Sequence, residues 1–117
     1  MMDTQERIRQ QVTTYPVVLY MKGTPHFPQC GFSGGAIKML AACSGPKLFT
    51  VDVLADPAIR DGIKTYANWP TIPQLYIKGE LIGGSDIMRE MFDQGELQKL
   101  LQAAVESGEG NYDAQDC

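Results

Sequence analysis

The stretch that decides the fold begins with the apolar run Val17-Val18-Leu19-Tyr20-Met21 and ends with Cys30-Gly31-Phe32-Ser33. The apolar run lacks the alternation of a strand with one solvated face, so it predicts a strand buried on both faces in the middle of a sheet. Residues 22–29 form a loop with two prolines and a glycine. Apolar residues then recur at helical spacing as far as Cys43, and we therefore expect Cys30 at the N-terminus of a helix.

Ser33 stands where a Cys-x-x-Cys motif would have its second thiol. A hydroxyl cannot close a disulfide, so whatever Cys30 binds or attacks must be resolved from outside the motif. The free amides and the positive dipole end of a helix N-terminus favour the thiolate form of Cys30. Lys22, at the end of the strand, is either a second positive influence on the sulfur or on an anionic ligand, or a solvated surface charge.

The remaining elements follow from capping and periodicity. Asp3 and Glu6 resemble a capping box for a helix over residues 4–14, and Asp56-Pro57 is an N-cap and first-turn pair for another helix. Residues 48–53, 74–77 and 81–82 read as strands, and the last two form an antiparallel hairpin. Ser85 is the expected N-cap of a further helix, and Gly95 separates it from a final amphipathic helix.

The expected order is α-β-α-β-α-β-β-α-α, which with right-handed crossovers gives a four-stranded mixed sheet flanked by helices on both faces. This α/β arrangement is the thioredoxin fold. We expect residues 1–106 to form the single domain and residues 107–117, which are rich in glycine and acidic residues, to be a flexible tail.

Composition narrows the class of function. The 117 residues are 44% hydrophobic and carry a net charge of -4, so no basic surface favours nucleic acid or anionic lipid. No run approaches the ~20 apolar residues that span a bilayer, and the N-terminus resembles neither a signal nor a transit peptide. Three cysteines do not make a secreted disulfide framework, and we expect a cytoplasmic protein that contacts neither nucleic acid nor membrane.

The other cysteines are not expected to resolve Cys30. Along a helix from Cys30 to Cys43, a rise of ~1.5 Å per residue separates the two by about 20 Å, beyond the roughly 7 Å Cα limit of a disulfide. We interpret Cys43 as a buried apolar residue. Cys117 ends the expected tail, where an exposed thiol is most simply an adventitious site of pairing.

Three further features suggest a ligand site, although each of them also has a purely structural interpretation. The Ile72-Pro73 bond before a strand is where a cis peptide would present backbone groups, although a trans loop proline is commoner. Gly83-Gly84-Ser85-Asp86 suits an anion or the zwitterionic end of a peptide-like ligand, or it is only a turn. Arg60 has the geometry to clamp a carboxylate, or it is an ordinary exposed arginine.

Together, Lys22, Cys30-Gly31-Phe32-Ser33, Trp69-Pro70-Thr71-Ile72-Pro73 and Gly83-Gly84-Ser85-Asp86 resemble the monothiol glutaredoxins of the Cys-Gly-Phe-Ser type, in their short single-domain bacterial form. The resemblance covers about residues 4 to 105. It implies that Cys30 is both the catalytic thiol and the metal ligand. It also implies a glutathione site made by Lys22, Gly31, Phe32, Arg60, Thr71, Ile72, Pro73, Gly84, Ser85 and Asp86. Lys22 and Arg60 would meet glutathione carboxylates, Ile72 would pair its backbone with the tripeptide before a cis Pro73, and Ser85 with Asp86 would receive the γ-glutamyl end.

The first functional hypothesis is an iron–sulfur carrier. A [2Fe–2S] cluster takes four ligands, usually thiolates, and one chain offers one well-placed sulfur. The resemblance implies a homodimer in which two Cys30 thiolates and two glutathione thiolates bridge the cluster, transfer to apo iron–sulfur proteins, and a mixed complex with a BolA-type protein.

The alternative hypothesis is a glutathione-dependent thiol–disulfide oxidoreductase that removes glutathione from proteins, for which one thiol suffices. Relatives of this type are generally poor oxidoreductases, so we expect weak activity at most. A third interpretation, a structural module with an inert cysteine, requires that replacing Cys30 changes nothing.

Overall fold

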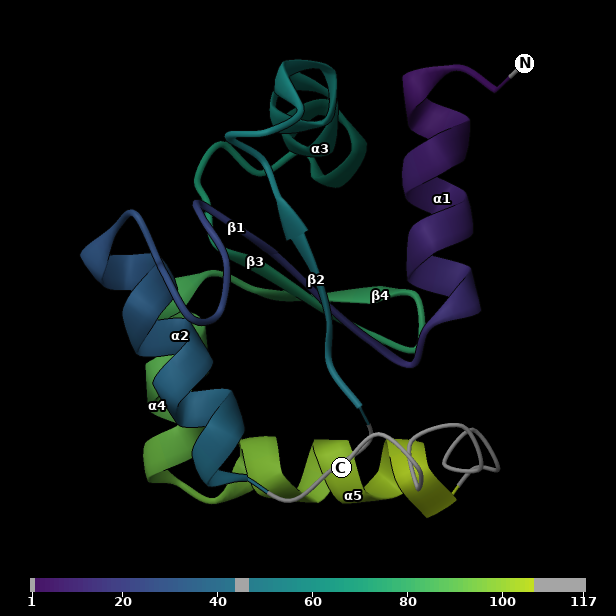
Figure 1. The fold of residues 1–117 in the computed structure, drawn as a ribbon. Coiled ribbons are helices and arrows are strands. Elements are labelled where there is room, and N and C mark those ends of the chain that lie inside the picture. The colour runs from purple at the N-terminus through teal and green to yellow at the C-terminus, as the bar shows by residue number, and fades with distance from the viewer. Residues whose placement is uncertain (1, 44–46, 107–117) are drawn as a thin grey trace.

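A four-stranded mixed sheet lies at the centre of the computed structural model, which describes residues 2–43 and 47–106 (Figure 1). The strands are β1 (Val17–Met21), β2 (Phe49–Asp52), β3 (Gln74–Ile77) and β4 (Glu80–Gly83). Their spatial order is β2-β1-β3-β4. β1 pairs parallel with β2 and antiparallel with β3, and β3 pairs antiparallel with β4. The mixed sheet that the sequence predicts is confirmed.

Five helices complete the described part of the chain. They are α1 (Thr4–Thr14), α2 (Gly31–Ala42), α3 (Pro57–Ala67), α4 (Ser85–Asp93) and α5 (Glu96–Glu106). The element order is the expected one, and α1 and α3 lie on one side of the sheet while α2, α4 and α5 lie on the other (Figure 1). The expected tail, residues 107–117, lies outside the described residues.

All five residues of β1 are buried, which confirms that this strand is covered on both faces. Val17, Leu19 and Met21 belong to a cluster with buried residues of α2, α4 and α5. Val18 and Tyr20 point to the opposite face, because successive strand residues alternate, and belong to a cluster with α1 and α3. One strand therefore joins both halves of the core.

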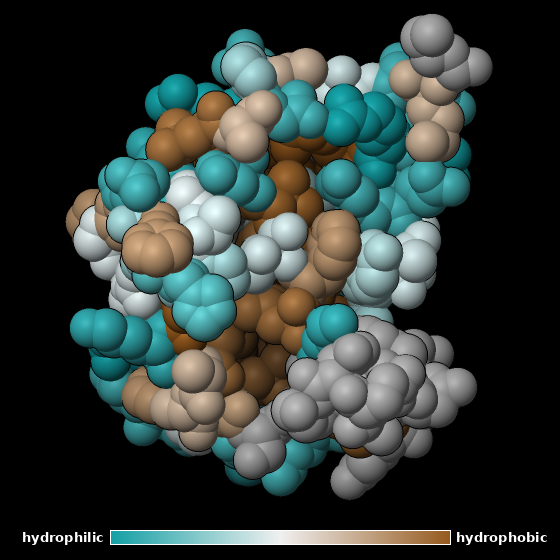
Figure 2. Space-filling view, viewed as in Figure 1, coloured by the Kyte–Doolittle hydropathy of each residue, from teal (hydrophilic) through white to brown (hydrophobic). Residues whose placement is uncertain are grey.

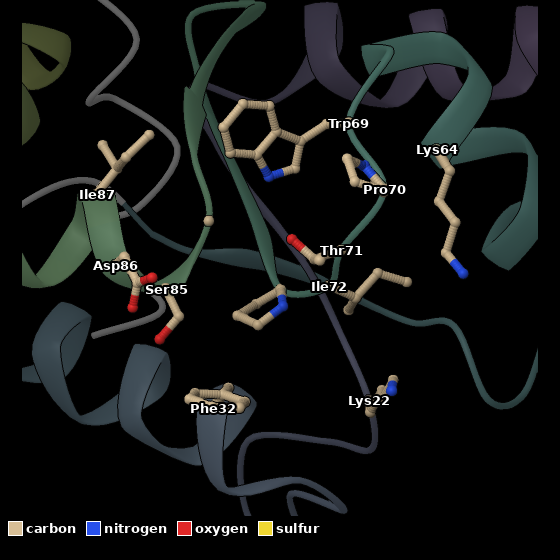
Figure 3. A pocket seen from close by; sticks show the side chains of 12 residues that line it. Lys22, Phe32, Lys64, Trp69, Pro70, Thr71, Ile72, Ser85, Asp86 and Ile87 are labelled. Carbon is tan, nitrogen blue, oxygen red and sulfur yellow. The ribbon is translucent and has the colours of Figure 1, made fainter.

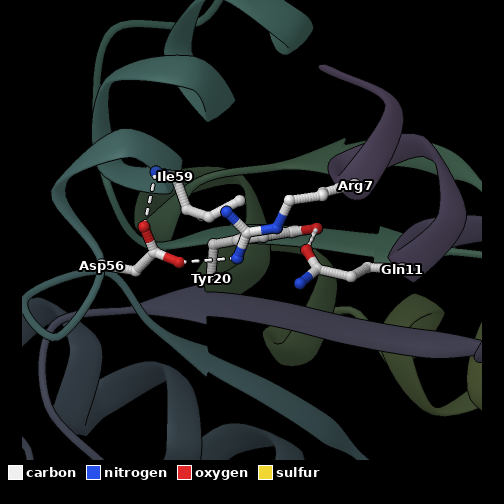
Figure 4. A network of polar contacts seen from close by, with 5 residues as sticks. All are labelled: Arg7, Gln11, Tyr20, Asp56 and Ile59. Atoms are coloured by element: carbon white, nitrogen blue, oxygen red, sulfur yellow. Dashed lines mark hydrogen bonds and ion pairs between the residues drawn. The ribbon is translucent and has the colours of Figure 1, made fainter. Parts of the chain in front are cut away.

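The capping pattern explains where α1 and α3 begin and how they meet. Asp3 forms the predicted capping box with Glu6, and Asp56 is the N-cap of α3, accepting a hydrogen bond from the amide of Ile59 at 3.2 Å. The second carboxylate oxygen of Asp56 meets the Arg7 guanidinium at 2.7 Å, and this hydrogen bond lowers the pKa of Asp56 (Figure 4). The α1–α3 contact is therefore held by a charged pair above the apolar cluster.

The expected bounds of three elements differ from the structure, and one of them is β4, which spans Glu80–Gly83 rather than residues 81–82. α4 has Gly84, not Ser85, as its N-cap, and Ser85 is the first helical residue. Gly84 has an extended backbone, and an added Cβ there would lie 3.2 Å from Trp69 Nε1, so glycine fits this position. The chain therefore enters the helix one residue earlier than the capping chemistry of serine suggests. β2 is shorter than residues 48–53, and as an edge strand it is half-buried along its length.

The surface seen in the orientation of Figure 1 is hydrophilic over most of its outline, with hydrophobic residues along its middle, beside the edge strand (Figure 2). Within residues 2–43 and 47–106, no helix combines the length and the apolar character needed to cross a membrane.

Candidate functional site

Cys30 is the N-cap residue of α2, as expected, and its side chain is half-buried. The pKa of the Cys30 thiol is lowered mainly by the backbone N–H of Ser33, against an opposing effect of burial. The N–H of Phe32, the positive charge of Lys22 and the hydroxyl of Ser33 lower it further. The helix start and Lys22 therefore both act on the sulfur in the direction that the sequence predicts, and the amides contribute more than the lysine.

Ser33 has a structural role that its place in the motif does not reveal. Its side chain is fully buried, and its Oγ accepts a hydrogen bond of 3.0 Å from the backbone N–H of Lys22. This bond ties the first turn of α2 to the end of β1. Ser33, which stands where a second thiol would be, therefore also holds the backbone of Lys22 in place.

Backbone amides of the loop between β1 and α2 form hydrogen bonds within the loop and to the side chain of Asp52 in β2. The N–H of Gln29 donates to the Lys22 carbonyl at 2.9 Å, and the N–H of Gly23 donates to Asp52 Oδ1 at 2.9 Å. Gly23 has φ 92°, and a Cβ there would lie 2.6 Å from the Phe27 carbonyl oxygen, so only glycine fits this turn. Phe27, at the loop's outer end, is 74% exposed.

A pocket of about 410 Å³ lies beside this helix start (Figure 3). It is lined by Lys22, Phe32, Lys64, Trp69, Pro70, Thr71, Ile72, Pro73, Gly84, Ser85, Asp86 and Ile87. The residues come from the end of β1, the start of α2, the end of α3, the loop before β3 and the start of α4. The structure thus brings together most of the site residues that the family resemblance implies: Lys22, Phe32, Thr71, Ile72, Pro73, Gly84, Ser85 and Asp86.

Opposite charges are separated across the pocket. Lys22 and Lys64 lie at one side, whereas Ser85 and Asp86, in the first turn of α4, lie at the other (Figure 3). Among the residues that the structure describes, neither lysine forms an ion pair. The pocket can therefore receive an elongated ligand with a carboxylate at one end and an ammonium group at the other.

The wall between these ends is the loop that precedes β3. The Ile72–Pro73 peptide bond is cis, as predicted. Trp69 packs against Gly84, where an added Cβ would lie 3.2 Å from the indole nitrogen and 3.3 Å from the Pro73 carbonyl oxygen. The indole N–H is buried without a hydrogen-bond partner. Because Gly84 has no side chain, the loop that contains Trp69 and Pro73 can lie close to the start of α4.

Three residues of the implied site do not line this pocket. Cys30 and Gly31 lie next to the lining residue Phe32 in the sequence, and Arg60 is half-buried on α3. Their roles toward a ligand stay predictions. Lys64, Trp69, Pro70 and Ile87 line the pocket although they were not among the implied residues. Lys64 follows Arg60 by one helical turn, so the two share a helix face, and this spacing was the available signal.

Cys43 is the C-cap of α2 and is half-buried rather than fully buried. Burial raises the pKa of its thiol, in contrast to Cys30. α2 lies between the two cysteines, as expected. Within the described residues, no group of three or more histidine, cysteine or acidic side chains could hold a metal ion.

Comparisons with known proteins identify the family of this chain. The glutaredoxin family model matches residues 17–82. The ycf64-like monothiol glutaredoxin of Synechocystis is 52% identical over 105 residues, which cover 90% of this chain and 97% of that relative. Glutaredoxin 4 of Escherichia coli is 51% identical over 102 residues, covering 87% of this chain and 88% of the relative. The solution structure of reduced poplar apo GrxS14 matches with a TM-score of 0.74 at 44% identity, covering 86% of this chain and 92% of that one. With its lone motif thiol, its fold and these relatives, the chain belongs to the glutaredoxin family, among the monothiol glutaredoxins.

Proposed function

We propose that this chain binds glutathione in the pocket and carries a [2Fe–2S] cluster, bridged between two copies of the chain, for delivery to apo iron–sulfur proteins. The observation that supports this proposal best is the Cys30 thiol, whose pKa is lowered, beside a pocket with separated charges, with the hydroxyl of Ser33 in place of a second thiol in the motif. Such a site can hold a shared ligand but cannot close a disulfide within the motif.

The charges of glutathione fit the two ends of the pocket. Its glycine carboxylate would lie near Lys22 and Lys64 on the cationic side, and the family resemblance adds Arg60, one helical turn before Lys64. Its γ-glutamyl ammonium would meet Asp86, and the neighbouring carboxylate would accept from the free amides at the start of α4. The backbone of Ile72 would pair with the middle of the tripeptide, as in strand addition.

The number of ligands favours a cluster shared by two chains. A [2Fe–2S] cluster takes four ligands, and within the described residues Cys30 is not part of a larger metal-binding group. Its lowered pKa fits the thiolate that a cluster needs. Two Cys30 thiolates and two glutathione thiolates complete the set, so the cluster and the dimer would form together.

The proposal extends to partners and location. The Cys30 side of the molecule, with Phe32 64% exposed, would face either a second copy or a BolA-type protein, and apo-proteins would receive the cluster there. A reducing cytoplasm would keep Cys30 free and supply glutathione.

Anaerobic reconstitution with iron and sulfide, with and without glutathione, tests the carrier function. We expect a coloured dimer for the wild type and for Cys43→Ser only when glutathione is present, and a colourless monomer for Cys30→Ser. Visible absorption and solution mass are the measurements. A wild-type protein that stays colourless and monomeric with glutathione contradicts the proposal, and colour in Cys30→Ser contradicts the ligand assignment.

The lowered pKa of Cys30 also favours a second candidate, a glutathione-dependent thiol transferase. The Cys30 thiolate would attack the glutathione sulfur of a glutathionylated protein, forming a Cys30–glutathione disulfide and releasing the protein thiolate. A second glutathione thiolate would then attack that disulfide, releasing oxidised glutathione and restoring Cys30. Steady-state turnover of a glutathione mixed disulfide, with Cys30→Ser as the control, measures this activity. We expect it to be weak, and rates typical of dithiol glutaredoxins would reverse the ranking of the two functions.

A further inference from the structure

Gln74, the first residue of β3, is fully buried, and together with Ser33 it is one of two buried polar side chains in the described core. It lies directly after the pocket residue Pro73 but does not itself line the pocket. A buried amide requires partners, because an unpaired one loses its hydrogen bonds to water without replacement. The partners of Gln74 therefore show what this residue does.

Both ends of the Gln74 amide are occupied. Its Nε2 donates to the backbone carbonyl of Trp69 at 3.0 Å and to that of Thr71 at 3.1 Å. Its Oε1 accepts from the hydroxyl of Tyr76 at 3.1 Å. Because the two carbonyls can only accept and the tyrosine hydroxyl can donate, the orientation of the amide is determined.

The two carbonyls belong to the loop that forms the pocket wall. Trp69, Pro70, Thr71 and Ile72 all line the pocket, and the loop has no strand partner of its own. The N–H of Trp69 donates to the Lys64 carbonyl at 3.1 Å, which fixes the start of the loop to the end of α3. The Gln74 amide binds two carbonyl groups of the loop, so that one buried side chain holds the backbone from Trp69 to Thr71 in place.

We propose that Gln74 is a positioning residue for the tripeptide site: its amide holds the Trp69–Ile72 wall in the shape that binds glutathione, without touching the ligand. This inference rests on the proposed glutathione function. A carboxylate at this position would face two carbonyl oxygens that it cannot satisfy, and an apolar side chain would leave both without a donor. In either case the wall loses the bonds that define its shape.

The chain provides its own probe and a matched control. Trp69 is the single tryptophan and stands in the wall, so its fluorescence reports on this loop. Gln11 accepts from the Tyr20 hydroxyl at 2.7 Å, which makes it a second Gln–Tyr pair on the same side of the sheet, and it does not line the pocket (Figure 4). Gln11→Met therefore controls for the loss of a Gln–Tyr hydrogen bond that is half-buried and lies away from the pocket.

The experiment compares Gln74→Met, which keeps the packing volume, Gln74→Glu, which keeps the shape, and Gln11→Met with the wild type. Acrylamide quenching of Trp69 in the ligand-free protein measures the order of the wall, and calorimetry measures the dissociation constant for glutathione. We expect both Gln74 variants to increase quenching and to weaken glutathione binding at least about tenfold, since two hydrogen bonds to the loop are lost. Gln11→Met should leave both quantities within about twofold of the wild type, since no hydrogen bond to the loop is removed.

The outcomes separate the two proposals. Wild-type quenching and affinity in the Gln74 variants, with reduced stability alone, would show that Gln74 only fills the core, and would overturn the positioning role. A wild type that does not bind glutathione would contradict the proposed function instead. In that case, unchanged quenching in the Gln74 variants would still overturn the positioning role, and increased quenching would support only the part of it in which Gln74 holds the loop in place.

Discussion

At the scale of single residues, Ser33 shows how one substitution serves two purposes. Its hydroxyl accepts the Lys22 N–H in a fully buried position, and oxygen is a better acceptor there than the sulfur of a cysteine. The same hydroxyl removes the possibility of a disulfide within the motif. Lys22 is thus held at the end of β1 by the residue that makes Cys30 a lone thiol, which couples the placement of the cation to the monothiol chemistry.

The pH dependence of Cys30 alkylation tests the effect of this environment. A lowered pKa means that the thiolate persists to lower pH, so the rate of reaction with iodoacetamide should rise with pH at a midpoint below that of an ordinary exposed cysteine. Cys43, whose pKa is raised by burial, should reach its midpoint at higher pH. Mass spectrometry of the two peptides after timed alkylation provides both profiles in one protein.

Lys22→Gln should move the Cys30 midpoint upward only in part, because the Ser33 amide is the larger cause and remains. A Cys30 midpoint equal to or above that of Cys43 in the wild type would contradict the assignment. So would a full return to the ordinary thiol value in Lys22→Gln, since that would make the lysine the dominant influence.

How far the site could be predicted depends on which residues carry local signals. Cys30 at a helix start and Asp86 after paired glycines are readable from neighbouring residues. The bond from Lys22 to Ser33 joins positions eleven residues apart, so it becomes visible only once β1 and α2 are packed. Gln74 resembles any strand residue in the sequence, and only its burial beneath the Trp69 loop reveals a role.

At the scale of elements, two glycines in or beside the first turns of helices should respond in opposite ways to replacement by alanine. Gly35 lies inside α2, where an added Cβ would meet no atom within 4 Å, so Gly35→Ala should raise the free energy of unfolding by up to about 1 kcal/mol. Gly84 caps α4 against Trp69 and Pro73, so Gly84→Ala should lower it by about 1–3 kcal/mol through overpacking. Urea unfolding measures both changes.

Gly84→Ala should also weaken the binding of a ligand in the pocket, because the added methyl group displaces the Trp69 loop. Gly35→Ala should leave ligand binding unchanged. If the two variants changed the free energy of unfolding equally and with the same sign, helix propensity alone would determine the effect. The contact between Gly84 and Trp69 would then not contribute to stability.

Element boundaries were predictable where one chemistry dominates. The capping box at Asp3 and the Asp56-Pro57 pair determine the starts of α1 and α3 without competition. Ser85 is a better capping residue than Gly84 by chemistry, but packing against Trp69 outweighs that preference. The start of α4 thus depends on a residue fifteen positions earlier, which no local pattern contains.

At the scale of the whole molecule, the sheet makes two apolar clusters into one unit. β1 and β3 contribute side chains to both clusters, so neither face can separate from the sheet without exposing the other. The pocket lies where elements from both faces meet: α3 and the Trp69 loop from one, α2 and α4 from the other. A stable site therefore requires both halves of the core.

This dependence predicts cooperative unfolding in which both faces are lost together. Leu19→Ala creates a cavity on the α2, α4 and α5 face and should lower the free energy of unfolding by about 2–5 kcal/mol. Trp69 directly follows the C-cap of α3, from the other face, yet its fluorescence and the far-ultraviolet circular dichroism should shift to the same new urea midpoint. Leu54→Ala, at a side chain that is 43% exposed, should change the free energy by less than about 0.5 kcal/mol. If the Trp69 transition in Leu19→Ala instead stayed at its wild-type midpoint while the dichroism shifted, the two faces would be separable, and the pocket wall would not depend on the core beneath α2.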